Sequence, residues 1–129
     1  MTGRFLLLLG VGTALMALGA ADEAGAEEAK YRHVVLFKFK DDAPAEAVQR
    51  VEQAFIALKD KVDLVREFEW GKNVSPEGLN QGFTHCFFVT FDSKEDLEKY
   101  LPHPEHEKFV SLLKPHLDKV LVVDYVTGG

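Results

Sequence analysis

The sequence contains a single cysteine, Cys86, among 129 residues, and it has no internal repeat. One cysteine excludes an intramolecular disulfide and a thiolate metal cage, so the stability of the fold must come from packing. The chain also has no basic cluster, and Lys+Arg 15 against Asp+Glu 21 give a net charge of −6. An acidic chain of this kind is poorly suited to phosphate backbones, so we expect no nucleic acid among its partners.

Long apolar runs are absent except between Phe5 and Leu18, after a lone cation at Arg4. This run is about 14 residues long, shorter than the ~20 that a spanning helix needs, and small residues follow it at a plausible cleavage site. We therefore expect residues 1–21 to be a secretory signal peptide. The mature protein would be exported, periplasmic or secreted, with no stable membrane insertion after cleavage; an uncleaved anchor is the alternative.

The rest of the chain divides into a short spacer and one domain. Residues 22–30 are rich in Ala, Gly and Glu without apolar periodicity, which is typical of a flexible spacer. Residues 31–127 show alternating and helical patterns. They predict strands at 31–39, 64–74, 83–91 and 121–126, and helices at 44–62, 93–101 and 104–113. The order βαββαβ indicates an α+β, ferredoxin-like domain with a four-stranded antiparallel sheet and helices on one face.

Both faces of this sheet are expected to be apolar. On the first strand His33, Val35 and Phe37 point one way, whereas Val34 and Leu36 point the other. Helices can cover one face only, and a second copy of the chain is the simplest cover for the other. The sequence therefore predicts a homodimer.

Candidate chemistry is concentrated in the segment YLPHPEH, which straddles a helix break and contains Tyr100, His103 and His106. His106 would lie in the first turn of a helix, where the dipole disfavours imidazolium, and a neutral imidazole can act as a base. Tyr100 could donate a hydrogen bond to a carbonyl or enolate oxygen. His33 and His85 have the strand parity of the face that looks toward the helices.

Other interpretations of these residues remain open. His103 could cap the following helix while Tyr100 and His106 hydrogen-bond to each other, which would make the segment architectural. A metal pair of His103 and His106 lacks a third ligand that the sequence can place nearby, so we expect no metal. Arg66 is either a surface residue at a strand end or a cation at a pocket mouth. The phenylalanines form a core, or line a hollow for a small apolar or aromatic ligand.

Five motifs follow one another along the chain: HVVLFKFK, WGKN, GFTHCFFVTF, YLPHPEH and VVDYV. In this order they resemble the stress-responsive A/B barrel (Dabb) family over His33 to Val126. The resemblance implies a dimeric α+β barrel built from ferredoxin-like subunits. Most members of that family have no assigned activity, but one plant member is a cofactor-free polyketide cyclase that performs an intramolecular aldol condensation.

The resemblance to this cyclase also implies roles for individual residues. His106 falls on the general base, Tyr100 on the tyrosine that orients it, and His33 and Asp124 on pocket positions. Phe55 replaces a pocket tyrosine and Leu117 a pocket tryptophan, so the identity of the substrate does not transfer. The candidate catalytic residues are thus His106, Tyr100 and His33, with no cofactor, and the candidate substrate-binding residues are His85, Phe55, Phe87, Asp124 and Arg66.

Two functions follow as alternatives. The chain is an exported, dimeric small-ligand-binding or stress-associated domain without assigned activity, or it is a cofactor-free cyclase, lyase or isomerase acting on a keto or phenolic substrate. Catalysis requires His106 near Tyr100 at an accessible hollow. An architectural role predicts that both side chains are buried and satisfy each other.

Overall fold

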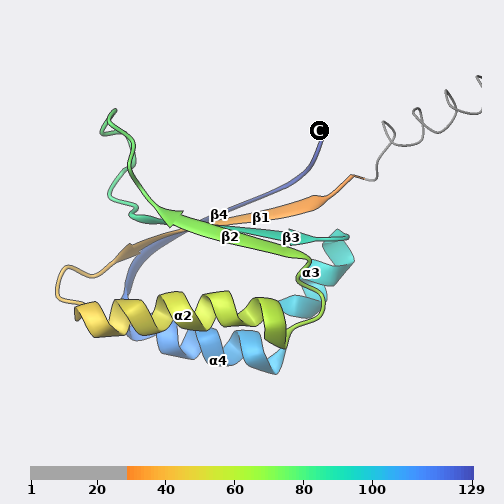
Figure 1. The fold of residues 1–129 in the computed structure, drawn as a ribbon, viewed down its shortest axis with the longest axis horizontal. Helices are drawn as coiled ribbons and strands as arrows, with labels where there is room; N and C mark the ends of the chain where they lie inside the picture. The colour runs from red at the N-terminus through yellow and green to blue at the C-terminus, as the bar shows by residue number, and fades with distance from the viewer. Residues whose placement is uncertain (1–28) are drawn as a thin grey trace, which may run out of the picture.

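The computed structural model describes residues 29–129, in which a twisted antiparallel sheet carries its helices on one side (Figure 1). In chain order the elements are β1 (Tyr31–Phe39), α2 (Ala45–Lys61), β2 (Glu67–Lys72), β3 (His85–Phe91), α3 (Lys94–Tyr100), α4 (Pro104–Leu113), the 3₁₀ turn η1 (Lys114–His116) and β4 (Leu117–Val126). The strand order β2-β3-β1-β4 confirms the predicted ferredoxin-like α+β fold. The expected signal peptide and, apart from Ala29 and Lys30, the expected spacer lie outside the described residues. Within 29–129, no helix combines the length and apolar character required to cross a membrane.

The helix ends follow the capping pattern of the sequence. The Asp96 N–H donates to Ser93 Oγ at 3.2 Å, and the Glu105 N–H donates to Nδ1 of His103 at 3.1 Å. Pro104 then occupies the first position of α4, where its missing N–H costs nothing. His103 is therefore a helix cap, as one interpretation of YLPHPEH predicted.

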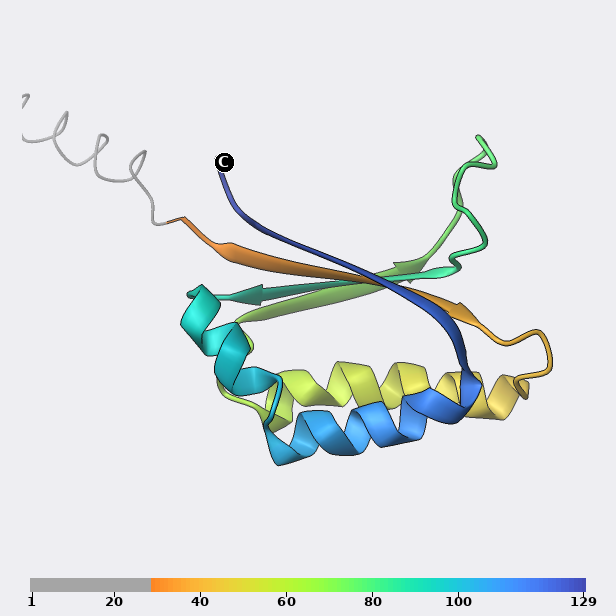
Figure 2. The same cartoon turned by 180° about the vertical axis from the view of Figure 1, so that it is seen from behind.

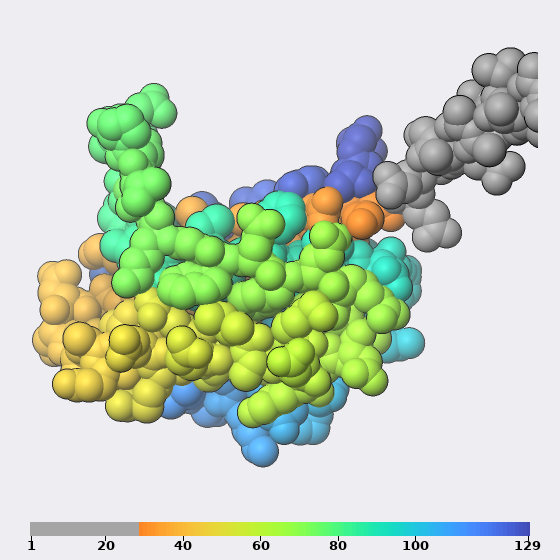
Figure 3. All heavy atoms as spheres, in the orientation of Figure 1, coloured from red at the N-terminus to blue at the C-terminus, as the bar shows by residue number. Residues whose placement is uncertain are grey.

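The strand ends differ from the expectation in both directions. β2 and β3 are shorter than expected: β2 begins only at Glu67, and residues 73–84 between the two strands form a loop that stands away from the body of the molecule (Figure 3). β4 begins earlier, at Leu117, because it pairs with β1 as far as Phe39. The result is one long β1–β4 ladder beside a shorter β2–β3 hairpin.

The core fills the space between the sheet and the helices α2 and α4. His33, Val35 and Phe37 of β1 are buried on this face, as the alternation of the sequence predicted. Phe87 of β3 is 0% exposed and its ring centroid lies 4.4 Å from that of Phe55 on α2. Aromatic packing of this kind holds α2 against the centre of the sheet.

β4 extends beyond the helix layer. It is the edge strand beside β1, and at its start it bends toward the end of α4, to which η1 connects it (Figure 2). Val120 and Val122 face the helix side yet remain 50% and 47% exposed, while Leu121 and Val123 on the other face are 45% and 49% exposed. The helices therefore leave apolar surface uncovered on both faces of this strand.

Replacing a core phenylalanine should cost far more than replacing a surface residue of the helix that packs on it. Phe87→Ala should lower the free energy of unfolding by about 3–5 kcal/mol, because it removes a buried ring and leaves a cavity. Gln53→Ala, on the exposed side of α2, should change it by less than about 0.5 kcal/mol. Denaturant unfolding of both variants measures the difference, and equal losses would contradict this description of the core.

Candidate functional site

A cavity of about 300 Å³ lies between α4 and the strands β1 and β4. This is at the lower end of the range for small-molecule sites. Its opening is bordered by exposed residues of β4 and of the α3–α4 corner, so it reaches solvent. Its lining is mainly apolar: His33, Val35, Phe37, Phe55, Leu101, His106, Phe109, Val110, Leu113, Lys114, Leu117, Val120 and Val122.

His106 lies at one end of this cavity, in the first turn of α4. Its Nδ1–H donates to the carbonyl of Leu101 at 2.9 Å, which leaves Nε2 as the nitrogen with a lone pair. Burial lowers the pKa of His106 below its ordinary value, and the nearby His33 acts in the same direction, although the Leu101 carbonyl partly opposes both. The imidazole is therefore neutral at neutral pH, which is the form a general base needs.

His33 reaches the same end of the cavity from β1. Its Nδ1 lies 2.6 Å from Oδ1 of Asp124 on β4, and because a carboxylate can only accept, the imidazole donates here. The antiparallel register places the two residues directly opposite each other. Asp124 also accepts a hydrogen bond from the Tyr31 hydroxyl, at 3.3 Å. This carboxylate fixes the ring of His33 and directs its lone pair to Nε2.

Tyr100 lies behind the two imidazoles and is fully buried. Its ring centroid is 4.5 Å from that of His106 and 6.4 Å from that of His33. Among residues 29–129, its hydroxyl has no hydrogen-bond partner. Burial raises the pKa of Tyr100 well above its usual range, so the hydroxyl remains protonated and is able to donate.

These contacts contradict the expected hydrogen bond between Tyr100 and His106. The two rings touch, but His106 donates to Leu101 instead, and the phenol is left without a partner. A buried polar group without a partner costs about 1–3 kcal/mol and calls for an explanation. A ligand oxygen that accepts a hydrogen bond from the Tyr100 hydroxyl would supply the missing partner, although Tyr100 is not among the residues that line the cavity.

The other candidate residues are placed differently. Phe55 lines the cavity, and Asp124 stands behind His33 without lining it. Phe87 belongs to the core beneath. Arg66 is exposed and pairs with Asp92, Nε to Oδ2 at 2.9 Å, which supports its interpretation as a surface residue rather than a cation of the cavity.

His85, the first residue of β3, forms a separate buried pair with Glu52. Its Nε2 lies 2.6 Å from Oε2 of Glu52 on α2, and its ring is stacked on Trp70 with 5.9 Å between centroids. Lys72 Nζ is 3.8 Å from the same carboxylate oxygen. Glu52 lies three residues before Phe55, beside the apolar stripe of α2, but the periodicity alone does not indicate that its carboxylate meets a histidine. His85 is thus absent from the cavity.

Several cavity residues were not among the candidates from the sequence. The clearest is Lys114, and the others belong to β1, to the end of α3, to the apolar stripe of α4 and to β4. The stripe is readable in the sequence, since Phe109, Val110 and Leu113 follow His106 at helical spacing. Lys114 carries no such signal, because a lysine at a helix end is ordinarily a solvated residue.

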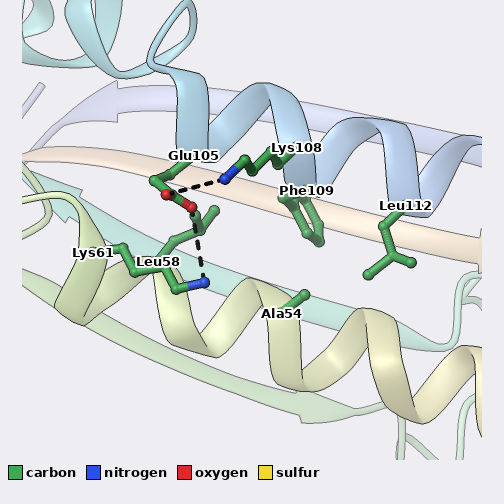
Figure 4. Close-up of a pocket in the computed structure, with 7 residues that line it drawn as sticks. All are labelled: Ala54, Leu58, Lys61, Glu105, Lys108, Phe109 and Leu112. Carbon is green, nitrogen blue, oxygen red and sulfur yellow. Dashed lines mark ion pairs between the residues drawn. The ribbon is translucent and has the colours of Figure 1, made fainter.

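A second hollow, about 190 Å³, lies on the outer surface between α2 and α4 (Figure 4). Glu105 points into it and pairs with Lys61 at 3.8 Å and Lys108 at 3.7 Å. The charges there already satisfy one another. Within the described part of the chain, no group of three or more His, Cys, Asp or Glu side chains is arranged to hold a metal ion.

Comparison with known proteins identifies the family. The family model described as Stress responsive A/B Barrel Domain matches residues 31–127. The chain belongs to this family. A stress-response A/B barrel domain-containing protein of Arabidopsis thaliana, HS1, is 43% identical over 101 residues, which cover 77% of this chain and 93% of that protein.

Two further relatives bear on activity and assembly. Olivetolic acid cyclase of Cannabis sativa is 29% identical over 94 residues, covering 73% of this chain and 93% of the cyclase. A dimeric protein of unknown function with a ferredoxin-like fold, from Bacteroides fragilis, is 31% identical with a TM-score of 0.61, covering 74% of this chain and 94% of that one. The proteins similar to this chain therefore include a cyclase and a dimeric ferredoxin-like protein.

The lowered pKa of His106 should make stability depend on pH. The native state holds the imidazole neutral, so the unfolded state binds the proton more readily below about pH 6.5, and the free energy of unfolding should fall as the pH drops through that value. His106→Gln keeps a donor for the Leu101 carbonyl but does not titrate. Denaturant unfolding at about pH 7.5 and pH 5 should show a smaller loss for this variant than for the wild type, and an equal loss would contradict the assignment.

Proposed function

We propose that the cavity binds a small apolar carbonyl or phenolic compound, and that His106 removes a proton from it in a cofactor-free cyclase, lyase or isomerase reaction. The observation that carries this proposal is the buried Tyr100 hydroxyl, which has no partner among residues 29–129 and lies beside two imidazoles. An architectural segment would have satisfied that hydroxyl internally. In a substrate site its partner would be a substrate oxygen that reaches past His106 and His33, because Tyr100 itself does not line the cavity.

The proposed step is a proton transfer at carbon. Nε2 of His106 takes a proton from the carbon next to the carbonyl group. The electron pair of the broken C–H bond moves to form a C=C bond, and the carbonyl oxygen becomes an enolate oxygen. The Tyr100 hydroxyl donates a hydrogen bond to this oxygen, which spreads the developing charge.

His33 supplies a second imidazole at the same end of the cavity. Held by Asp124 at 2.6 Å, it presents Nε2 in a fixed orientation. Its Nε2 can accept the proton that His106 has removed and return it to the product, either after the enolate has attacked a second carbon or directly to the enolate. Asp124 acts through His33 and is a positioning residue.

The relatives support the reaction class but not a substrate. Olivetolic acid cyclase is named as a cyclase, and its similarity extends over 73% of this chain. Phe55 and Leu117, which differ from the pocket residues that the family resemblance implies, both line the cavity here. Their apolar side chains favour a ligand that differs from that of the cyclase.

A binding function without turnover is the second candidate. It is favoured by the cavity wall, where, apart from the two histidines and Lys114, each lining residue among those described is apolar. Such a wall is suited to an apolar ligand whether or not a reaction follows. The two functions differ in whether His106 exchanges protons with the ligand.

We also propose that the chain forms a homodimer through the sheet face that carries no helix. Val34, Leu36 and Phe88 lie on this face together with exposed Val123 and Tyr125 of β4. Apolar surface of this extent on a small domain is a typical interface, and the relative from Bacteroides fragilis is dimeric. Finally, we propose export of the protein, on the sequence pattern of residues 1–21.

Exchange of carbon-bound hydrogen tests the base directly, without knowledge of the natural substrate. The wild type should accelerate deuterium incorporation next to the carbonyl of 2-octanone in D₂O near neutral pH, as followed by NMR. His106→Gln should lose at least about 100-fold of this acceleration. The rate should fall as the pH drops through the lowered pKa of His106. Binding of 2-octanone with no acceleration would favour the function without turnover.

A charge on the open sheet face should prevent dimerisation. Val123→Glu should convert the dimer to a monomer, because a buried carboxylate without a partner is costly. Val122→Glu is the matched control, since it lies next in sequence with similar exposure but on the cavity side. Sedimentation equilibrium gives the masses, and a wild-type monomer or a dimeric Val123→Glu variant would overturn the proposed interface.

Export can be checked at the chain terminus. N-terminal sequencing of the protein recovered from outside the cytoplasm should begin near Asp22, as expected for cleavage after small residues. Recovery of the intact Met1 terminus would contradict the proposal.

A further inference from the structure

The cavity is elongated, with different chemistry at its two ends. His106 and Lys114 both line it, and they lie eight residues apart along α4 and its end. At a rise of 1.5 Å per residue this separation is about 12 Å. On the sheet side, the lining runs from His33 to Phe37, about 13 Å of strand. The spacing along α4 and the spacing along β1 therefore give about the same length for the cavity.

Lys114 is the one permanently charged side chain among the described residues of the lining. It forms no ion pair with any of residues 29–129, whereas Lys61 and Lys108 on the outer side of the helices share Glu105 (Figure 4). Lys114 is exposed at the border of an apolar cavity, in a chain with a net charge of −6. Its charge is available to a ligand.

The surroundings of Lys114 also favour one orientation of a charged ligand. An adjoining surface hollow shares Leu101, His106, Val110 and Lys114 with the cavity, and Glu107 lines it as well. Glu107 follows His106 directly, so it repels an anion at the histidine end. Lys114 attracts an anion at the other end.

We propose that Lys114 determines specificity for anionic ligands, and that the natural ligand is an apolar oxo-carboxylate. Its carbonyl oxygen lies at Tyr100 and His106, and its carboxylate lies about 12 Å away at Lys114. The chain between the two groups occupies the apolar middle of the cavity. This inference rests on the proposed function, because it takes the histidine end as the site of the reacting carbonyl.

Two probes that differ in one charge test the inference. The first is 9-oxodecanoate, a methyl ketone with a terminal carboxylate, and the second is its neutral methyl ester. Titration calorimetry should show that the wild type binds the acid at least about fivefold more tightly than the ester. This ratio should shrink as salt is added, because the charge of Lys114 is solvent-accessible.

The variants separate the charge of Lys114 from its packing. Lys114→Met should reduce the ratio of acid to ester affinity to about one, while Lys114→Arg should preserve the preference for the acid. Lys108→Met is the matched control, since it removes a lysine of the neighbouring helix α4 that is paired with Glu105, and it should leave the ratio unchanged. Thermal unfolding of each variant shows that the fold is retained.

The outcomes distinguish this inference from the proposed function. Equal affinity of the wild type for acid and ester, together with deuterium exchange that depends on His106, would overturn the role of Lys114 and leave the proposed function intact. A ratio that survives in Lys114→Met would also overturn it. If neither probe binds and neither exchanges deuterium, both proposals fail.

Discussion

The hydrogen bond between His33 and Asp124 is the contact on which the candidate site depends. It joins the first strand to the last, and the antiparallel register brings the two residues opposite each other across 91 positions of sequence. Because the carboxylate holds Nδ1, the imidazole cannot rotate, and its Nε2 is directed to the end of the cavity that His106 borders. Tyr100 closes this end from behind, buried between helix and sheet.

The cavity itself follows from a mismatch between the sheet and the helices. Two long helices cover the inner strands, but β4 lies beyond them and is exposed on both faces. The space left between β4 and α4 is walled by the apolar stripe of α4 and by Val120 and Val122. An edge strand with apolar residues on both sides therefore serves two purposes: one face borders the cavity, and the other is the surface proposed to meet a second copy.

Much of this arrangement could be predicted from local patterns. Strand alternation placed His33 on the helix side, and the helix break placed Tyr100 near His106, because these features depend on neighbours in sequence. The hydrogen bonds could not be predicted. The partner of His106 is a backbone carbonyl, which every residue offers equally, and the isolation of the Tyr100 hydroxyl depends on the exact fit of the core. The cation at the cavity is also not the one that the sequence suggested. Arg66, the candidate, pairs with Asp92, while Lys114, an ordinary helix-end lysine in sequence, lines the cavity.

The central claim is that the buried Tyr100 hydroxyl is kept for a ligand rather than for the fold. The most direct test is Tyr100→Phe, measured twice. Because the hydroxyl has no partner among the described residues, its removal should leave the free energy of unfolding unchanged or raise it by about 1 kcal/mol. The same variant should lose at least about tenfold of the deuterium exchange on 2-octanone, because the enolate loses its donor. A variant that unfolds more easily but exchanges deuterium as fast as the wild type would contradict the account.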